Sequence, residues 1–141
     1  MDKGTLIDVR NLKKYFPIHR GMWKKTVRYV RAVDDVSFRI NEGETLGLVG
    51  ESGCGKTTCG RCILRAIEPT SGEVHFKQNG EFANIVDMDK EELRAIRKEI
   101  QLIFQDPYSS LNPRMTVKDI IGEPLLVNGI AIGKELEDRV I

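Results

Sequence analysis

The first part of the chain alternates hydrophobic and polar residues in the manner of β-strands. Three strand-like stretches are predicted: residues 6–10, 27–33 and 36–40. In the last of them Val36, Phe38 and Ile40 alternate with polar residues, which makes one face apolar. A surface loop over residues 18–25, which carries Trp23, is expected between the first two strands. The pattern predicts an antiparallel β lead-in.

Two short apolar runs lack a helical period and are expected to be buried strands of a parallel sheet. They are residues 45–49 and residues 100–104. Between them, residues 73–77 form another predicted strand, and Asn79-Gly80 places a hairpin turn soon after it. The chain therefore combines antiparallel hairpins with strands typical of a parallel sheet.

Helices are predicted between and after these runs. One begins near Lys56, carries an apolar stripe and is expected to stop at Pro69. Asp89 with Glu92 resembles a capping box, and this predicts a second helix through about Lys98.

The last thirty residues are also predicted to be helical. Thr116 and Asp119 form another predicted cap, and the helix that follows is expected to be interrupted by Pro124 and to end at the Asn-Gly pair of residues 128–129. Residues 133–141 predict a further helix that has only begun, so we expect the chain to be part of a longer domain.

Charge is balanced overall and uneven along the chain. The 141 residues hold 22 Lys and Arg against 21 Asp and Glu, so no global field points to nucleic acid. Residues 1–31 hold nine Lys and Arg against two Asp, a charge of +7, which leaves −6 for the rest. This basic lead-in could steer an anionic nucleotide or touch anionic lipid headgroups. A solvated sheet edge guarded by lysines explains it equally well.

The sequence also limits membrane and metal chemistry. A charged N-terminus without an apolar stretch does not predict a signal peptide, and no apolar run approaches the roughly 18 residues of a membrane helix. Cys59-Gly60-Arg61-Cys62 has the C-x-x-C spacing of a redox or metal site. Because no second cysteine pair accompanies it, we expect these cysteines to be packing residues.

The strongest chemical signal is a glycine-rich loop with one lysine. It is Gly50-Glu51-Ser52-Gly53-Cys54-Gly55-Lys56-Thr57-Thr58, which fits the phosphate-binding pattern G-x-x-x-x-G-K-[ST]. Glycines allow the backbone N–H groups to form a concave nest for oxyanions, and a helix that begins at the loop directs its free N–H groups to the same place. In such a loop Lys56 supplies a charge for the β- and γ-phosphates and Thr57 a hydroxyl for Mg²⁺.

The neighbours of this loop favour nucleotide binding. An apolar run precedes it and a predicted helix follows it, which is the context that the motif requires. The alternative is a glycine-rich turn with an incidental lysine.

With these elements in place, the chain resembles the N-terminal half of an ATP-binding cassette (ABC) transporter ATPase over nearly all of its length. Within that family it is most similar to the ATP-binding subunits of oligopeptide, dipeptide and nickel importers. The stretches that carry this likeness are Lys14-Tyr15-Phe16-Pro17, Ala32-Val33-Asp34-Asp35-Val36-Ser37-Phe38, the glycine-rich loop and Phe104-Gln105-Asp106-Pro107-Tyr108-Ser109-Ser110-Leu111-Asn112-Pro113.

The resemblance implies roles for matching residues. Phe16 best matches the aromatic that stacks on adenine in this family, with Tyr15 second, and Val33 matches a small apolar residue that lines the base. Gln105 matches the glutamine that reaches Mg²⁺ and the attacking water, so Lys56 and Gln105 would be catalytic and Thr57 and Gln105 would hold Mg²⁺. Phe16 as a plain core residue and Gln105 as an ordinary loop residue remain alternatives.

Several motifs of the family do not occur in these 141 residues. No Leu-Ser-Gly-Gly-Gln signature is present, and no apolar run that ends in Asp-Glu follows Gln105. Phosphoryl transfer needs several groups acting together to position the water and to stabilise charge. We therefore expect these residues alone to bind nucleotide weakly and to hydrolyse little.

The predicted fold class is α/β. It consists of a P-loop NTPase core with a parallel sheet and flanking helices, an antiparallel β lead-in and the start of a helical subdomain, in an incomplete domain. The expected divisions within the N-terminal part of one ABC ATPase domain are about residues 1–48 for the lead-in, 45–105 for the core and 106–141 for the glutamine loop and helical subdomain.

The function implied by the resemblance is that of an ATP-binding subunit that energises a peptide-type importer by ATP binding and hydrolysis. The implied ligands are ATP and Mg²⁺. The implied partners are a second ABC ATPase domain and membrane-spanning subunits met by the loop from Gln105 to Pro113, at the cytoplasmic face of the membrane. No nucleic acid is expected. The alternatives are a soluble ABC-type ATPase that acts on nucleic acid or the ribosome, and a shortened chain without activity of its own.

Overall fold

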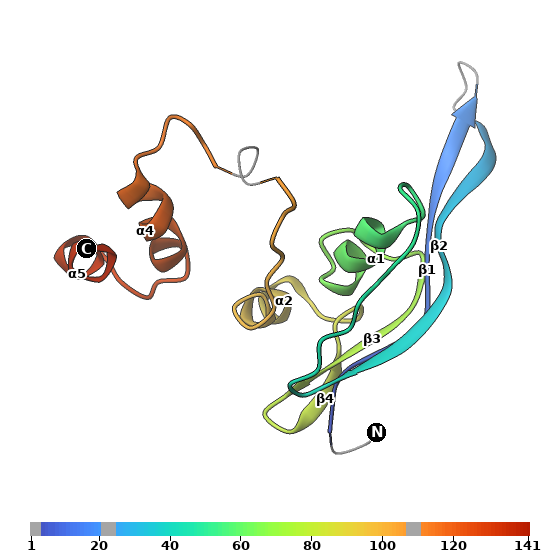
Figure 1. The fold of residues 1–141 in the computed structure, drawn as a ribbon, viewed down its shortest axis with the longest axis horizontal. Helices are drawn as coiled ribbons and strands as arrows, with labels where there is room; N and C mark the ends of the chain where they lie inside the picture. The colour runs from blue at the N-terminus through green and yellow to red at the C-terminus, as the bar shows by residue number, and fades with distance from the viewer. Residues whose placement is uncertain (1–3, 21–24, 107–110) are drawn as a thin grey trace. The chain divides into compact units, whose positions relative to one another are not determined.

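The protein is described by a computed structural model that places residues 4–20, 25–106 and 111–141. The chain divides into two compact units, Met1–Leu102 (unit 1) and Ile103–Ile141 (unit 2). Figure 1 shows the strands in unit 1.

Unit 1 contains a four-stranded antiparallel sheet. Its strands are β1 (Thr5–Arg20), β2 (Lys25–Asn41), β3 (Ser71–Gln78) and β4 (Glu81–Asn84), in the order β2-β1-β3-β4. Every neighbouring pair is antiparallel. The predicted antiparallel lead-in is therefore present, and it pairs with a third and a fourth strand from later in the chain.

The hairpin of β1 and β2 is longer than the sequence pattern indicates. The prediction of a surface loop over residues 18–25 is wrong at Ile18, which pairs with Arg28 inside the ladder. Trp23 lies outside the described residues. The sequence did not predict a strand here because its residues are mostly polar and basic. A two-stranded ribbon that is exposed on both faces lacks the alternation of apolar and polar residues that burial of one face imposes.

Residues 78–81 form the hairpin turn that Asn79-Gly80 predicts. Both central residues have positive φ, 52° at Asn79 and 88° at Gly80. These angles suit the type I′ turn, whose twist matches that of the two flanking strands.

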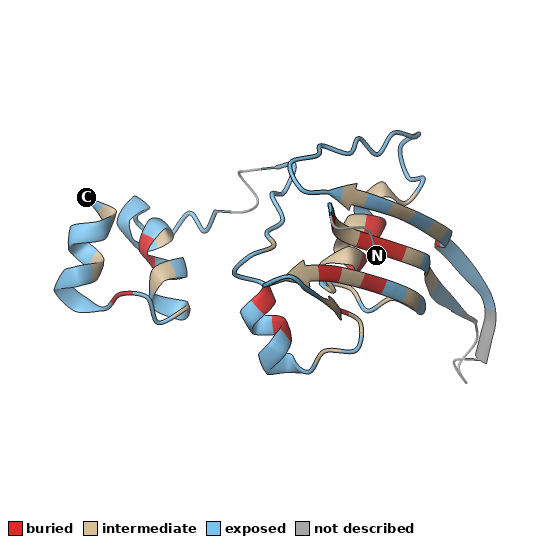
Figure 2. Ribbon diagram, turned by 90° about the horizontal axis from the view of Figure 1, so that it is seen from below, coloured by how far each residue is buried: buried red, intermediate tan, exposed pale blue. Residues whose placement is uncertain are grey.

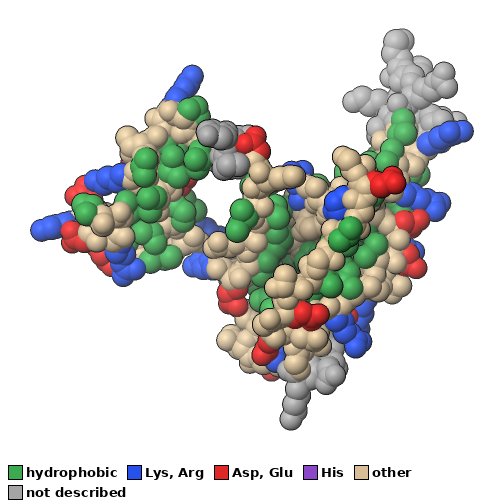
Figure 3. Space-filling view, viewed as in Figure 1, with side chains coloured by type: hydrophobic (Ala, Val, Ile, Leu, Met, Phe, Trp, Pro, Cys, Tyr) green, Lys and Arg blue, Asp and Glu red, His purple; other side chains and the backbone are tan. Residues whose placement is uncertain are grey.

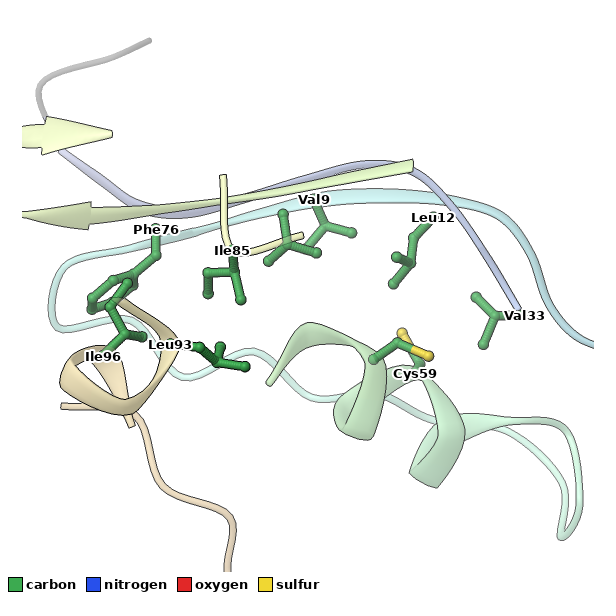
Figure 4. Packing of buried hydrophobic residues seen from close by; sticks show 10 residues of the cluster. Val9, Leu12, Val33, Cys59, Phe76, Ile85, Leu93 and Ile96 are labelled. Carbon is green, nitrogen blue, oxygen red and sulfur yellow. The ribbon is translucent and has the colours of Figure 1, made fainter. Parts of the chain in front are cut away.

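One face of the sheet packs on two helices, α1 (Lys56–Ile63) and α2 (Lys90–Ile96). In Figure 4, Val9 and Leu12 of β1 point toward the helices, and Cys59 and Leu93 point back toward the sheet. Figure 2 shows the buried residues of unit 1 gathered on the sheet and on these helices. The core comprises Val9, Leu12, Val33, Cys59, Cys62, Val74, Phe76, Ile85, Leu93 and Ile96.

The two cysteines of the C-x-x-C stretch are part of this core. Burial raises the pKa of both the Cys59 and the Cys62 thiol, which keeps them protonated and unreactive. Their position agrees with the expected packing role.

Helix α2 begins as the sequence predicts. The Asp89 carboxylate accepts hydrogen bonds from the N–H groups of Glu91 and Glu92, and the Glu92 side chain accepts one from the Asp89 N–H. This reciprocal capping box satisfies N–H groups that have no partner within the helix.

Helix α1 ends earlier than predicted. It stops at Ile63, well before Pro69, because Arg65 adopts a left-handed conformation with φ of 47°. The N–H groups of Ala66 and Ile67 then both turn back to the carbonyl of Arg61. The expected extension of the helix to the proline is therefore wrong, and the cause is a local turn that the apolar pattern does not reveal.

Unit 2 contains α4 (Val117–Val127) and α5 (Gly133–Val140). Thr116 and Asp119 form the predicted capping box. The prediction that Pro124 interrupts this helix is wrong, since α4 continues through it to Val127. Proline removes one hydrogen bond from a helix but has a helical φ, so the remaining bonds carry the helix past it.

Two predicted strands are absent from the described structure. Residues 45–49 and 100–104 have no strand pairing there, and Val49 and Ile103 are each 93% exposed. The backbone groups of a strand need neighbours to bond with, and no parallel strand is available to either run in the described part of the chain. The parallel sheet of the predicted fold class is thus not formed by the described residues, whose sheet is antiparallel.

No helix among the described residues combines the length and apolar character needed to cross a membrane.

Asp8 lies almost fully buried on the face of the sheet opposite the core. Its Oδ2 accepts hydrogen bonds from Arg10 Nε at 3.0 Å and Nη2 at 2.7 Å, and its Oδ1 lies 3.3 Å from Arg39 Nε. Burial acts to raise the pKa of this carboxyl. The hydrogen bonds and positive charges of Arg10 and Arg39 outweigh it and hold the pKa below its usual range.

The first prediction concerns Gly72 at the start of β3. Its φ is +103°, and a Cβ there would lie 2.6 Å from the carbonyl oxygen of Asn11 and from Leu12 Cα. Gly72→Ala should therefore destabilise the fold by about 3 kcal/mol, from backbone strain and overpacking together. Gly80→Ala is the matched control, since Gly80 also has positive φ but open space around it. Its cost should be about 1 kcal/mol. Equal costs in chemical denaturation would contradict the proposed clash.

The second prediction concerns Asp8→Asn. A lowered pKa in the folded state means that the ionised carboxylate stabilises the fold above the unfolded-state pKa of about 3.9, and that this contribution disappears as pH falls through the folded-state pKa. At neutral pH the variant should be less stable by about 1 kcal/mol, allowing for solvent around the two guanidinium groups. The difference should vanish in strong acid. Denaturation curves of both proteins over a pH series measure the difference in stability. A difference that stays constant with pH would exclude ionisation of Asp8 as its cause.

Candidate phosphate-binding site

Residues 50–58 form a curved loop that leads into α1. The N–H of Cys54 donates to the carbonyl of Glu51 at 3.3 Å, which closes a turn. Gly53 and Gly55 have φ of 82° and 100°, and residues with a side chain rarely adopt these angles. The two glycines therefore bend the loop back on itself.

Gly55 also has a steric role. A Cβ built on it would lie 1.9 Å from the carbonyl oxygen of Ala32 in β2. Only glycine allows the loop to approach the strand this closely. The contact anchors the glycine-rich loop to β2 of unit 1 and fixes where α1 begins.

Lys56 folds over the loop from the first position of α1. Its Nζ donates hydrogen bonds to the carbonyl oxygens of Gly50 and Glu51, both at 2.7 Å, and lies 3.6 Å from Cys54 Sγ. The first turn of α1 has no acidic residue and no side chain that caps it. The positive end of the helix and the ammonium group therefore act on the same place, which suits an anion.

A cavity of about 350 Å³ opens beside this loop. It is lined by Arg31, Ala32, Val33, Asp34, Val36, Leu48, Val49, Cys54, Gly55, Lys56 and Cys59. Its lining combines apolar side chains with two cations, Lys56 and Arg31, and one carboxylate, Asp34. Such a cavity suits a ligand that has an apolar part and a negatively charged part.

Arg31 and Asp34 are lining residues that the sequence did not single out. Arg31 Nη1 lies 3.2 Å from Asp34 Oδ2, and its guanidinium carbon lies 5.4 Å from the centre of the Tyr15 ring. The Tyr15 hydroxyl also donates to Asp34, which raises the pKa of Tyr15 and lowers that of Asp34. The basic character of residues 1–31 was the one available signal, and it did not point to a single arginine.

The three residues matched to the base differ in their surroundings. Val33 is buried in the core and lines the cavity. Tyr15 is held by Asp34 through its hydroxyl. Phe16 is 39% exposed, with Lys14 Nζ 4.9 Å from its ring centre.

The two residues that are predicted to bind Mg²⁺ belong to different units. Thr57 is exposed in the first turn of α1 in unit 1, whereas Gln105 is exposed in unit 2. Their meeting around a metal ion stays a prediction. Within the described ranges, no group of three or more His, Cys, Asp or Glu side chains forms a site for a metal ion.

Three relatives show what the chain is similar to. It is 46% identical over 140 residues to the oligopeptide transport ATP-binding protein AppF of Bacillus subtilis, covering 99% of this chain and 41% of that protein. It is 52% identical over 121 residues to the probable peptide ABC transporter ATP-binding protein y4tS of Sinorhizobium fredii, covering 86% and 33%. It is 47% identical over 140 residues to the glutathione import ATP-binding protein GsiA of Escherichia coli K12, covering 99% and 22%. The chain thus spans well under half of each relative.

Solved structures agree with these relatives. The dimeric structure of MJ0796, a bacterial ABC transporter cassette, matches with a TM-score of 0.72 at 28% identity, over 95% of this chain and 53% of that one. A post-hydrolysis state of the same cassette, bound to ADP and Pi, matches with a TM-score of 0.70 at 27% identity, over 96% and 54%. The chain therefore has part of the ABC cassette fold.

A family model described as ABC transporter matches residues 33–140, which include the glycine-rich loop, α1 and both helices of unit 2. The chain belongs to the ABC transporter family.

Proposed function

We propose that residues 50–58 bind the phosphates of ATP. The observation that carries this proposal is the position of Lys56 Nζ over a loop bent by Gly53 and Gly55, at the N-terminus of a helix without an acidic first turn. The loop carbonyls and Cys54 Sγ hold the ammonium in place. Its positive charge would act on a phosphate oxygen, which would replace one of these acceptors. The adjoining cavity leaves room for the rest of the nucleotide.

Phe16 is the stronger candidate for stacking on the adenine. The Tyr15 hydroxyl and ring are engaged with Asp34 and Arg31, so moving them toward a base would break these contacts. The Phe16 ring is partly exposed and has no hydrogen bond to lose, so a base would have to displace only Lys14 Nζ, which lies 4.9 Å from the ring centre. Val33 would contribute an apolar wall, since it lines the cavity from the core side.

Thr57 and Gln105 are the residues proposed to hold Mg²⁺. Hydroxyl and amide oxygens are ligands that Mg²⁺ accepts, and the exposed Thr57 hydroxyl at the start of α1 fits this role. When bound, the ion would neutralise charge on the phosphates. Gln105 would orient water through its amide, and Lys56 would stabilise the charge that develops on the phosphate.

We further propose that the whole protein is an ATP-hydrolysing subunit of a peptide-type importer. The names of the relatives, which refer to oligopeptide transport, peptide transport and glutathione import, support this class. The region from Gln105 to Pro113 would contact membrane-spanning subunits from the cytoplasmic side of the membrane. A second ABC ATPase domain would complete the nucleotide site, as the dimeric form of the MJ0796 cassette suggests.

The two exposed apolar runs fit this proposal. Residues 45–49 and 100–104 would become parallel strands when further strands of the same domain lie beside them, which would also cover Val49 and Ile103. On this basis, residues 1–48, 45–105 and 106–141 remain the proposed lead-in, core and glutamine-loop parts of one ABC ATPase domain.

Nucleotide binding leads to the third prediction. Mg-ATP at about 100 times its Kd should stabilise the folded chain by roughly 2.7 kcal/mol. Lys56→Ala should abolish this shift, because it removes the charge that faces the phosphates. Thermal melting with and without nucleotide measures both effects.

Lys98→Ala is the matched control, because Lys98 is exposed after α2 and lies outside the cavity. It should keep the full shift. If the melting temperature of the folded wild-type chain did not change with Mg-ATP, this result would count against the proposed site.

The fourth prediction concerns turnover. The 141 residues by themselves should release no more phosphate from ATP than their Lys56→Ala variant, because Lys56, Thr57 and Gln105 leave the attacking water without a carboxylate. A phosphate-release assay tests this. Hydrolysis clearly above that of the variant would show that another group supplies the missing base.

A further inference from the structure

The outer part of the β1–β2 hairpin is a ribbon of two strands that no third strand supports. The last residue of β1 that pairs with β3 is Lys13. Beyond it, β2 is the one partner of β1 among the described residues, and Figure 1 shows both strands extending past β3. We define the distal ribbon as residues 15–18 of β1 with residues 28–31 of β2.

Both faces of the distal ribbon carry exposed apolar side chains. Residues directly opposite each other in an antiparallel pair lie on the same face. One face holds the pairs Phe16 with Val30 and Ile18 with Arg28, and the other holds Tyr15 with Arg31 and Pro17 with Tyr29. Ile18, Val30 and Tyr29 are 47%, 51% and 60% exposed. A two-stranded ribbon is marginally stable in water, so apolar surface on both faces indicates that something else covers it.

The sequence stretch that contains the ribbon is basic. Between Asp8 and Asp34 the sequence has eight Lys and Arg and no Asp or Glu, so this stretch is +8 and the rest of the chain is −7. Arg28 and Arg31 are exposed cations of the distal ribbon itself, and Arg31 also pairs with Asp34. Figure 3 shows hydrophobic and basic side chains together along the described part of the ribbon.

We propose that the distal ribbon docks on the surface of an anionic lipid bilayer. Its cations would pair with anionic headgroups while Ile18 and Val30, which share one face, enter the boundary between headgroups and acyl chains. Tyr29, on the opposite face, would lie at the level of the headgroups. Anionic leaflets attract basic segments near the surface, and tyrosine favours this boundary because its ring is apolar and its hydroxyl is polar. The complementary charge commits the proposal to an anionic rather than a neutral surface.

The apolar residues favour lipid over nucleic acid. Proteins that bind single strands present aromatic rings on which bases stack. The side chains of the ribbon that are about half exposed or more include the aliphatic Ile18 and Val30, which have no ring to stack, and a single aromatic, Tyr29. Aliphatic side chains are stabilised when an acyl layer removes them from water, and they have no ring with which to stack on a base.

The fifth prediction tests lipid binding with the whole 141-residue chain. Vesicles of phosphatidylcholine with about 30% phosphatidylserine should bind it at least ~10-fold more tightly than pure phosphatidylcholine vesicles, and about 1 M NaCl should remove the difference. Co-sedimentation measures both. Equal binding to the two vesicle types, or binding to neither, would overturn the proposal. So would binding to duplex or single-stranded DNA without binding to vesicles.

Two variants with matched controls locate the contact on the ribbon. Arg28→Glu should weaken binding to the anionic vesicles by roughly 10-fold, whereas Lys98→Glu, with the same change in charge on an exposed residue elsewhere in unit 1, should not. Ile18→Ser with Val30→Ser should weaken it similarly, whereas Leu126→Ser with Ile132→Ser, exposed residues of unit 2, should not. Circular dichroism confirms that each variant is folded. If the ribbon variants and their controls in the rest of the chain bound the anionic vesicles equally well, the ribbon would not be the part of the protein that contacts the lipid.

The test is independent of nucleotide binding. Lys56→Ala should bind the anionic vesicles as well as the wild type, because Lys56 lies at the glycine-rich loop and not on the ribbon. Vesicle binding without a nucleotide shift, or the reverse, would therefore separate this proposal from the proposed function.

Discussion

The close approach of Gly55 to the Ala32 carbonyl is the contact on which the candidate site depends. It brings the glycine-rich loop against β2, and Cys59 and Cys62 of the helix that follows are part of the core. The same packing gives the loop a rigid support, since the sheet beneath it is held by Val9, Leu12 and Val74. A phosphate site made of backbone N–H groups needs such support, because its affinity comes from donors that are already in position.

The sheet separates two kinds of chemistry in unit 1. Its core face is apolar and carries α1, with Lys56 at the start of that helix. Its opposite face is polar, and there Asp8 satisfies both of its oxygens with Arg10 and Arg39. A buried carboxylate without such partners would cost several kcal/mol. The arginines of the lead-in therefore have at least two roles, since Arg10 and Arg39 stabilise the sheet and Arg31 lines the cavity.

Elements whose signals are local were predictable. The capping boxes at Asp89 and Thr116 and the Asn79-Gly80 turn each depend on contacts within four residues, and all three form as expected. The three wrong predictions of where a helix or strand ends also have specific causes. Arg65 stops α1 through one left-handed residue, α4 tolerates Pro124, and the ribbon at Ile18 is exposed on both faces and so lacks a burial pattern.

The sequence by itself determined the glycine-rich loop, its lysine and the helix after it, because the pattern that predicts them is contained in nine consecutive residues. It also indicated the family, through motifs that are short and contiguous. Only the tertiary structure decided that Gly55 must be glycine for steric reasons and that Arg31 and Asp34 line the cavity. It also showed that the apolar runs at residues 45–49 and 100–104 have no strand partner among the residues that the structure places. Each of these depends on residues distant in sequence, and an apolar run becomes a strand only where another strand supplies its hydrogen bonds.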